Sequence, residues 1–158
     1  MFTDSILIKI LIGAGWGLII GVVTIFLSKK LTLKRTEDPV KAAPIDTPLF
    51  KVMSIVVAVV ASVAVMLTST DTALAMRNEL LLIPIASIAV VDSLVRKIPN
   101  PLLLLMIIIQ AVYLTYYCIA EKDVTILLTA GFGFFIGFAS CAFTTLLKVP
   151  VGAGDTKY

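Results

Sequence analysis

Two aspartates stand apart from the other acidic residues because each follows a long apolar run. Asp92 ends the run that begins at Ile83, and Asp155 follows Gly152 and Gly154 just beyond the last apolar stretch. A carboxylate near the hydrocarbon core of a bilayer is costly, so it is a functional-site hypothesis by default. The other eight of the ten acidic residues are expected in loops or at termini, where a carboxylate is solvated.

The spacing of these two aspartates predicts that they meet at one membrane face. They are 155 − 92 = 63 residues apart. Two membrane crossings with a short turn use about 40–50 residues, so the chain returns to the same face before Asp155. Two carboxylates that share one proton can activate a water molecule and polarise a peptide carbonyl. This chemistry is that of an aspartyl protease, and it requires no cofactor.

Each aspartate also has a simpler interpretation. Asp92 lies four residues before Arg96, which is the spacing of a helical ion pair. Gly152 and Gly154 follow Pro150, so they can merely end a helix. The spacing of a phosphate-binding loop is absent. In the functional interpretation, the two glycines let an extended substrate backbone approach Asp155.

The composition indicates that lipid surrounds most of the chain. Hydrophobic residues make up 59% of the 158 residues and charged residues 15%, where a soluble domain has about a quarter charged residues. The mean hydropathy is +1.08. These values exclude a disordered chain, a disulfide scaffold and an ordinary cytosolic domain. Histidine-based triads and zinc sites are excluded because there is no histidine, and Cys118 and Cys141 show no metal-ligand spacing.

Five apolar stretches predict an all-α polytopic membrane protein, with about five transmembrane helices in one bundle over residues 1–158. They are residues 6–28, 52–68, 80–95, 102–120 and 124–147. The third is the shortest, and it contains Pro84, whose freed carbonyl neighbouring helices can satisfy. We expect it to lie inside the bundle. Asn100 and Pro101 are suited to the cap and first position of the fourth helix.

Basic residues predict the orientation of the spans. With five spans, one face holds segments 29–51, 92–101 and 148–158 and ten of the thirteen Lys and Arg residues. The other face holds Lys9, Arg77 and Lys122. Because basic loops stay in the cytoplasm, the N-terminus is expected outside. Segment 29–51 is then a short basic cytoplasmic loop.

Small residues recur at every fourth position in two of the predicted spans. Gly13, Gly17 and Gly21 lie in the first, and Gly133 and Gly137 in the fifth. This spacing lets two helix backbones approach closely, so it predicts helix packing within the bundle.

Two motifs together resemble the prepilin peptidase family of membrane aspartyl proteases. The first is Asp92 followed seven residues later by Pro99-Asn100. The second is Gly152-Ala153-Gly154-Asp155-Thr156-Lys157. The resemblance covers about residues 80–158 and includes the two spans between the motifs. It implies that Asp92 and Asp155 are the catalytic pair, with Pro99, Asn100 and Lys157 as supporting motif residues.

The resemblance also implies a substrate and a location. The substrates would be type IV prepilins, or pilin-like secretion or competence proteins, cleaved at the cytoplasmic face of the inner membrane. Nucleic acid is not an expected partner. Relatives of presenilin share Gly-x-Gly-Asp, but they place Tyr where this chain has Val91, and they lack the counterpart of Pro99-Asn100.

This sequence departs from the family pattern in two ways. Segment 29–51 has no cysteine, so the zinc module of bifunctional members is absent and N-methylation is not implied. Family members continue with further spans, whereas this sequence stops at Tyr158. We therefore expect a truncated form that inserts into the membrane but needs C-terminal helices, or an oligomer partner, for cleavage. The alternative is a non-catalytic membrane subunit that acts as an assembly partner.

Overall fold

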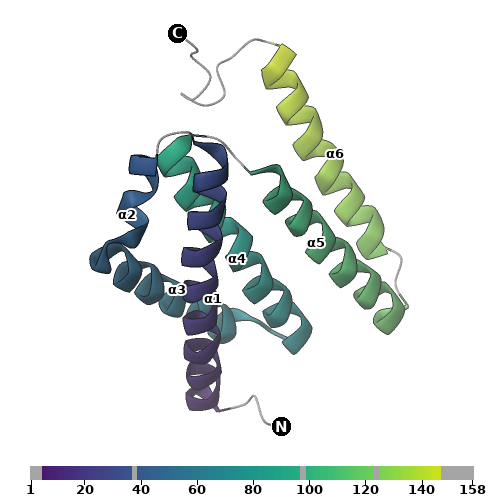
Figure 1. Ribbon diagram of the computed structural model, residues 1–158. Helices are drawn as coiled ribbons and strands as arrows, with labels where there is room; N and C mark the ends of the chain where they lie inside the picture. Colours follow the sequence, from purple (N-terminus) through teal and green to yellow (C-terminus); the bar gives the residue numbers. More distant parts are fainter. Residues whose placement is uncertain (1–4, 37–38, 97–98, 123–124, 147–158) are drawn as a thin grey trace. The chain divides into compact units, whose positions relative to one another are not determined.

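The computed structural model describes residues 5–36, 39–96, 99–122 and 125–146, and all regular elements in these ranges are helical. The all-α prediction is confirmed. The elements, labelled in Figure 1, are α1 (Ile6–Arg35), the 3₁₀ helix η1 (Pro39–Ala42), α2 (Ala43–Asp46), α3 (Pro48–Thr68), α4 (Thr72–Val95), α5 (Asn100–Glu121) and α6 (Thr125–Leu146). The chain divides into two compact units, residues 1–110 and 111–158.

Four helices of the described chain are long and apolar enough to cross a membrane, where the sequence predicts five. They are α1, α3, α4 and the Asn100–Ala120 part of α5. The fifth predicted span coincides with α6, whose apolar stretch among the described residues is only Leu127–Ile136. A helix of this length rises about 15 Å, which is half of the hydrocarbon thickness. The described residues therefore support four spans.

Two helices are longer than their apolar runs predict. The first helix continues past residue 28 to Arg35, so much of the predicted loop 29–51 is helical. Lysine, leucine and arginine are good helix formers, and the basic side chains of the last turn complement the helix dipole. The helix of the third predicted span, α4, begins at Thr72 instead of residue 80, because the Asp71 carboxylate caps it by accepting a 2.7 Å hydrogen bond from the Leu74 N–H.

The first and third helices pack backbone against backbone along the predicted glycine stripe. A Cβ atom added at Gly17 would lie 2.4 Å from Val59 Cα. At Gly13 it would lie 2.8 Å from Val63 Cα, and at Gly21 2.9 Å from Ile55 Cα. These contacts confirm the predicted packing role of the first stripe and make the two helices antiparallel. In α6, a Cβ added at Gly133 would meet no atom within 4 Å, and the side chain of residue 137 lies outside the described set.

The predicted weak span, α4, is a continuous helix that packs against α1 and α3. Its buried face holds Ala75, Glu79, Pro84, Ser87 and Val91. Because Pro84 is fully buried in this face, the interruption in the hydrogen-bond ladder lies inside the bundle, as expected. Many large apolar side chains point outward from α1, α3 and α4, as lipid contact requires.

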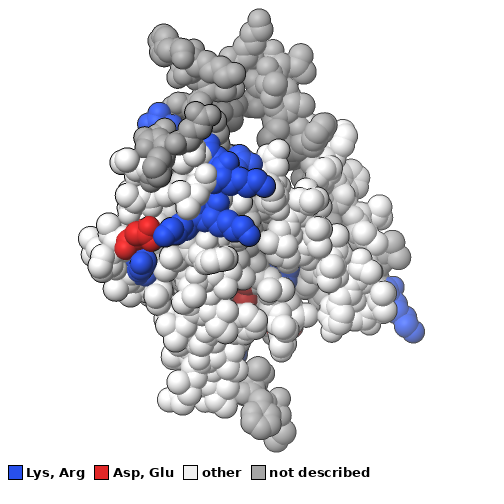
Figure 2. All heavy atoms as spheres, viewed as in Figure 1, with Lys and Arg blue, Asp and Glu red and all other residues white. Residues whose placement is uncertain are grey.

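Several charged side chains lie at the end of the bundle that contains the C-terminus of α1. Lys34 and Arg35 form the last turn of α1, and Lys29 forms an ion pair with Asp46 at 2.8 Å. Figure 2 shows a patch of Lys and Arg side chains, in blue, near the C-terminal end of α1. The short elements η1 and α2 cover this end and bury Ala42 and Ile45.

Candidate functional site

The candidate aspartate Asp92 lies in the last turn of α4, with its side chain exposed. The residue before it, Val91, is fully buried, so Asp92 lies beside the packed face of α4 and not in it. The helix ends at Arg96, which adopts a left-handed conformation (φ 53°, ψ 38°), and the Arg96 N–H donates to the Asp92 carbonyl at 2.8 Å. The carboxylate is thus held on a helix and faces outward.

The ion-pair interpretation of Asp92 is not supported by the described residues. Within them, no side-chain ion pair or hydrogen bond joins Asp92 to Arg96, although both side chains are exposed. The contact between the two residues is the backbone hydrogen bond of the helix end. This position is electrostatically unfavourable for a carboxylate, because the C-terminal end of a helix dipole is negative.

The Pro99-Asn100 motif begins α5. Pro99 is fully buried, and its carbonyl accepts hydrogen bonds from the N–H groups of Leu102 (3.0 Å) and Leu103 (3.4 Å). Asn100 is exposed and is already the first residue of the helix, so the predicted cap is displaced by one position. The motif therefore fixes where the chain turns from α4 into α5.

The second motif lies outside the described residues. Gly152, Gly154, Asp155 and Lys157 all belong to the segment 147–158. The structure thus describes one half of the predicted pair, and the distance between Asp92 and Asp155 stays a prediction.

The structure also contains a buried carboxyl group that the sequence analysis placed in a loop. Glu79 is 1% exposed on the packed face of α4, and Ser62 Oγ of α3 donates a 2.7 Å hydrogen bond to its Oε2 atom. Its other oxygen, Oε1, is buried without a hydrogen-bond partner among the described residues. Hydropathy places Glu79 before the apolar run, but its four-residue spacing from Ala75 is a signal that could have placed it on the buried face.

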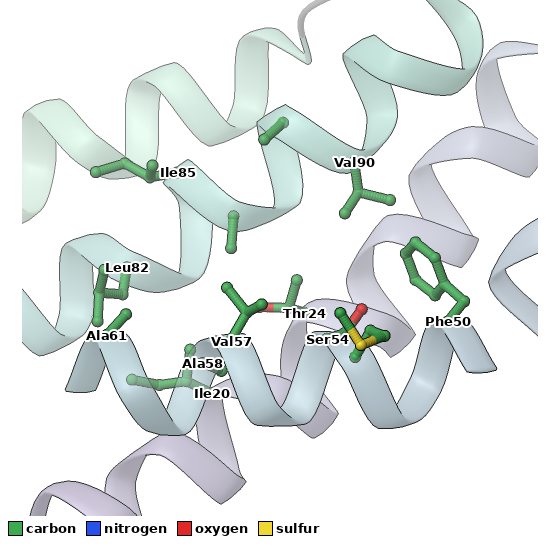
Figure 3. Close-up of a pocket in the computed structure, with 13 residues that line it drawn as sticks. Ile20, Thr24, Phe50, Ser54, Val57, Ala58, Ala61, Leu82, Ile85 and Val90 are labelled. Carbon is green, nitrogen blue, oxygen red and sulfur yellow. The ribbon is translucent and has the colours of Figure 1, made fainter. Parts of the chain in front are cut away.

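A largely apolar cavity of about 420 Å³ lies between α1, α3 and α4. Figure 3 shows side chains from all three helices around it, including Thr24, Ser54, Phe50, Ile85 and Val90. The Thr24 hydroxyl is buried without a hydrogen-bond partner among the described residues, as are those of Ser28, Thr32 and Ser87. The cavity has the lining of a site for apolar groups.

The cysteines and the possible metal ligands of the described residues form no site. Cys118 is a half-buried free thiol on α5, and the side chain of Cys141 lies outside the described set. In the described ranges, no three His, Cys, Asp or Glu side chains form a group that could hold a metal ion.

Comparison of the chain with protein-family models, with curated proteins and with solved structures finds no match.

Proposed function

We propose that this chain is an intramembrane aspartyl endopeptidase of the prepilin-peptidase type, with Asp92 and Asp155 as its catalytic pair. The observation that carries the proposal is the joint presence of Asp92 with Pro99-Asn100 and of Gly152-Ala153-Gly154-Asp155-Thr156-Lys157, with two predicted spans between them. The position of Asp92 is compatible with it, since its side chain is exposed in the last turn of α4.

In the proposed mechanism, the two carboxylates hold one proton between them because like charges at short range disfavour double ionisation. The ionised carboxylate takes a proton from water as the water oxygen attacks the scissile carbonyl carbon. The protonated carboxyl donates a hydrogen bond to the carbonyl oxygen and stabilises the tetrahedral intermediate. Proton transfer to the amide nitrogen then releases the two peptide products.

The proposed substrates are type IV prepilins or pilin-like secretion or competence proteins. Each has a short leader and then an apolar helix, so the scissile bond comes to the cytoplasmic face of the inner membrane. The charge bias supports this location, since it predicts segments 29–51 and 92–101 in the cytoplasm and the N-terminus outside.

The first prediction tests this pair directly. In a cleavage-competent form, with C-terminal helices supplied and a pilin-like substrate co-expressed, Asp92→Asn and Asp155→Asn should each abolish leader removal, measured by the mass of the substrate. Asparagine keeps the shape of aspartate but cannot exchange the proton. The double variant should lose no more activity than either single variant, because the two residues act as one unit.

The matched control is Asp46→Asn, which removes another exposed carboxylate near the same end of the bundle. It should leave cleavage unchanged. Leader removal by the Asp92→Asn variant at the wild-type rate would exclude Asp92 from catalysis. No cleavage by the wild-type chain, alone or with C-terminal helices supplied from a longer relative, would favour a non-catalytic assembly subunit.

A further inference from the structure

The Glu79–Ser62 pair is a polar contact in the middle of an apolar interface. The two residues belong to α4 and α3, and both are at most 1% exposed. Ser62 is also next to the glycine stripe, because a Cβ added at Gly13 would lie 3.2 Å from the Ser62 carbonyl oxygen. All three helices therefore meet around this carboxyl group.

The charged residues near Glu79 do not neutralise it among the described residues. Arg77 of α4 directs Nε and Nη2 to the Asn78 side chain, at 3.1 and 2.7 Å. Lys9 of α1 and Asp71, at the start of α4, line a pocket beyond the next helical turn. Lys51 of α3 is at the other end of the bundle, as is Asp92. An ionised Glu79 would thus be a buried charge with no counter-ion among the described residues, which is strongly unfavourable.

A proton neutralises this carboxyl group better than a metal ion does. Calcium and magnesium require six or more oxygen ligands, and one carboxyl with one hydroxyl falls far short. The described residues hold no group of three metal-binding side chains. A proton needs only Oε1, the oxygen that is buried without a partner.

A pocket with several polar lining residues lies one helical turn from the pair. It has a volume of about 200 Å³ and is lined by Lys9, Met66, Ser69, Thr70, Asp71, Thr72 and Ala75. Met66 is four residues from Ser62, and Ala75 is four residues from Glu79, so each lies one turn away on the same helix face. Met66 and Ala75 are therefore the pocket-lining residues that lie one turn from the pair on their helices.

We propose that Glu79 is a proton-binding site, a neutral carboxylic acid held by Ser62 inside the bundle, which exchanges its proton through the pocket at the N-terminal end of α1. The site is independent of the proposed peptidase pair. It uses a different carboxyl group, which lies on α4 more than three turns before Asp92.

The test uses the full chain in proteoliposomes, with infrared spectroscopy and with dicyclohexylcarbodiimide, an apolar reagent for protonated carboxyl groups. The acid proton moves to a carbodiimide nitrogen, the carboxylate oxygen bonds to the central carbon, and rearrangement leaves a stable N-acylurea. We expect a carboxylic-acid C=O band at neutral pH that Glu79→Gln removes, and one adduct on the Glu79 peptide that disappears at high pH. Absence of the acid band in the wild-type chain would overturn the proposal.

Met66 provides the test of the route. Met66→Ala should enlarge the opening and speed labelling of Glu79, and Met66→Leu, which keeps the volume, should leave the rate near that of the wild type. Equal rates in all three proteins would exclude entry through this pocket. An adduct that persists in the Glu79→Gln protein would place the reactive acid elsewhere and would overturn the assignment.

Discussion

Asp46 shows how a single surface residue is affected by its neighbours. It accepts a 2.8 Å hydrogen bond from Lys29 Nζ, and Lys51 Nζ lies 3.9 Å away. The hydrogen bond from Lys29 lowers the pKa of the Asp46 carboxyl below its ordinary value of 3.8; desolvation opposes this shift, and the charges of Lys29 and Lys51 add to it. The carboxylate thereby joins the end of α1 to the beginning of α3.

The second prediction concerns the pH dependence of this contact. Because the folded-state pKa of Asp46 is depressed, its stabilisation is present above the ordinary value of 3.8 and is lost as the pH falls through the lower folded-state pKa. Asp46→Asn should therefore lower the unfolding midpoint slightly at pH 7 and not at all at strongly acidic pH.

Thermal unfolding of both proteins in detergent at the two pH values measures this difference. The effect should be small and should shrink with added salt, since both partners are about half exposed. A difference that grows toward acidic pH would contradict the assignment.

Residue-scale chemistry was predictable from the sequence only in part. Asp92 is predicted as a site residue from its place after an apolar run; the structure describes it in the last turn of α4, and its catalytic role stays a prediction. The sequence analysis places Glu79 in a loop because a hydropathy value is averaged over neighbouring residues. The polar residues Arg77 and Asn78 lower this average around Glu79. Burial depends on which face of a helix meets its partners, and a mean over a window contains no such information.

At the scale of elements, the glycine stripe of α1 makes a third prediction. Gly17→Ala should destabilise the bundle by about 1–3 kcal/mol, the usual cost of overpacking. The added Cβ would meet the α3 backbone at Val59 Cα, which cannot move away as a flexible side chain could. The measurement is the folded fraction during titration with a denaturing detergent.

Gly15 supplies the matched control on the same helix. A Cβ added there meets no atom within 4 Å. Gly15→Ala should be neutral or slightly stabilising, because alanine has less backbone freedom to lose than glycine. Equal losses for Gly15→Ala and Gly17→Ala would show that the contact with α3 does not determine the loss of stability.

The extents of the helices show where sequence patterns succeed and fail. The centres of the predicted spans lie within helices, because apolar runs of this length have few other solutions in lipid. The predicted ends of the spans are wrong where polar residues continue a helix beyond the apolar run. This occurs in the last two turns of α1 and in the first two turns of α4. Capping by Asp71 and the helix propensity of Lys and Arg determine those ends, and hydropathy measures neither.

At the scale of the whole molecule, the fourth prediction decides between four and five spans. A reporter that is active only in the cytoplasm should give signal after Thr36 and no signal after Asp71, because the basic residues lie mostly on the side of the first fusion. Signal after Asp71 would contradict the orientation.

A fusion after Tyr158 tests α6. Signal there would mean that α6 crosses the membrane, as its sequence predicts, and that Asp155 reaches the same face as Asp92. Absence of signal would leave four crossings, consistent with the apolar stretch described for α6. The two aspartates would then lie on opposite faces, and the proposed peptidase pair could not form.

The contact between α1 and α3 also limits how this sequence can diverge. Most packing contacts can drift, because a larger side chain on one helix is offset by a smaller one on the other. Gly13 and Gly17 have no such freedom, since the nearest atoms are backbone atoms that every residue of α3 possesses. Outward positions such as Leu18 and Val22 can exchange among apolar residues without consequence. In strongly diverged sequences with this fold, we expect glycines at four-residue intervals in the first helix to change last.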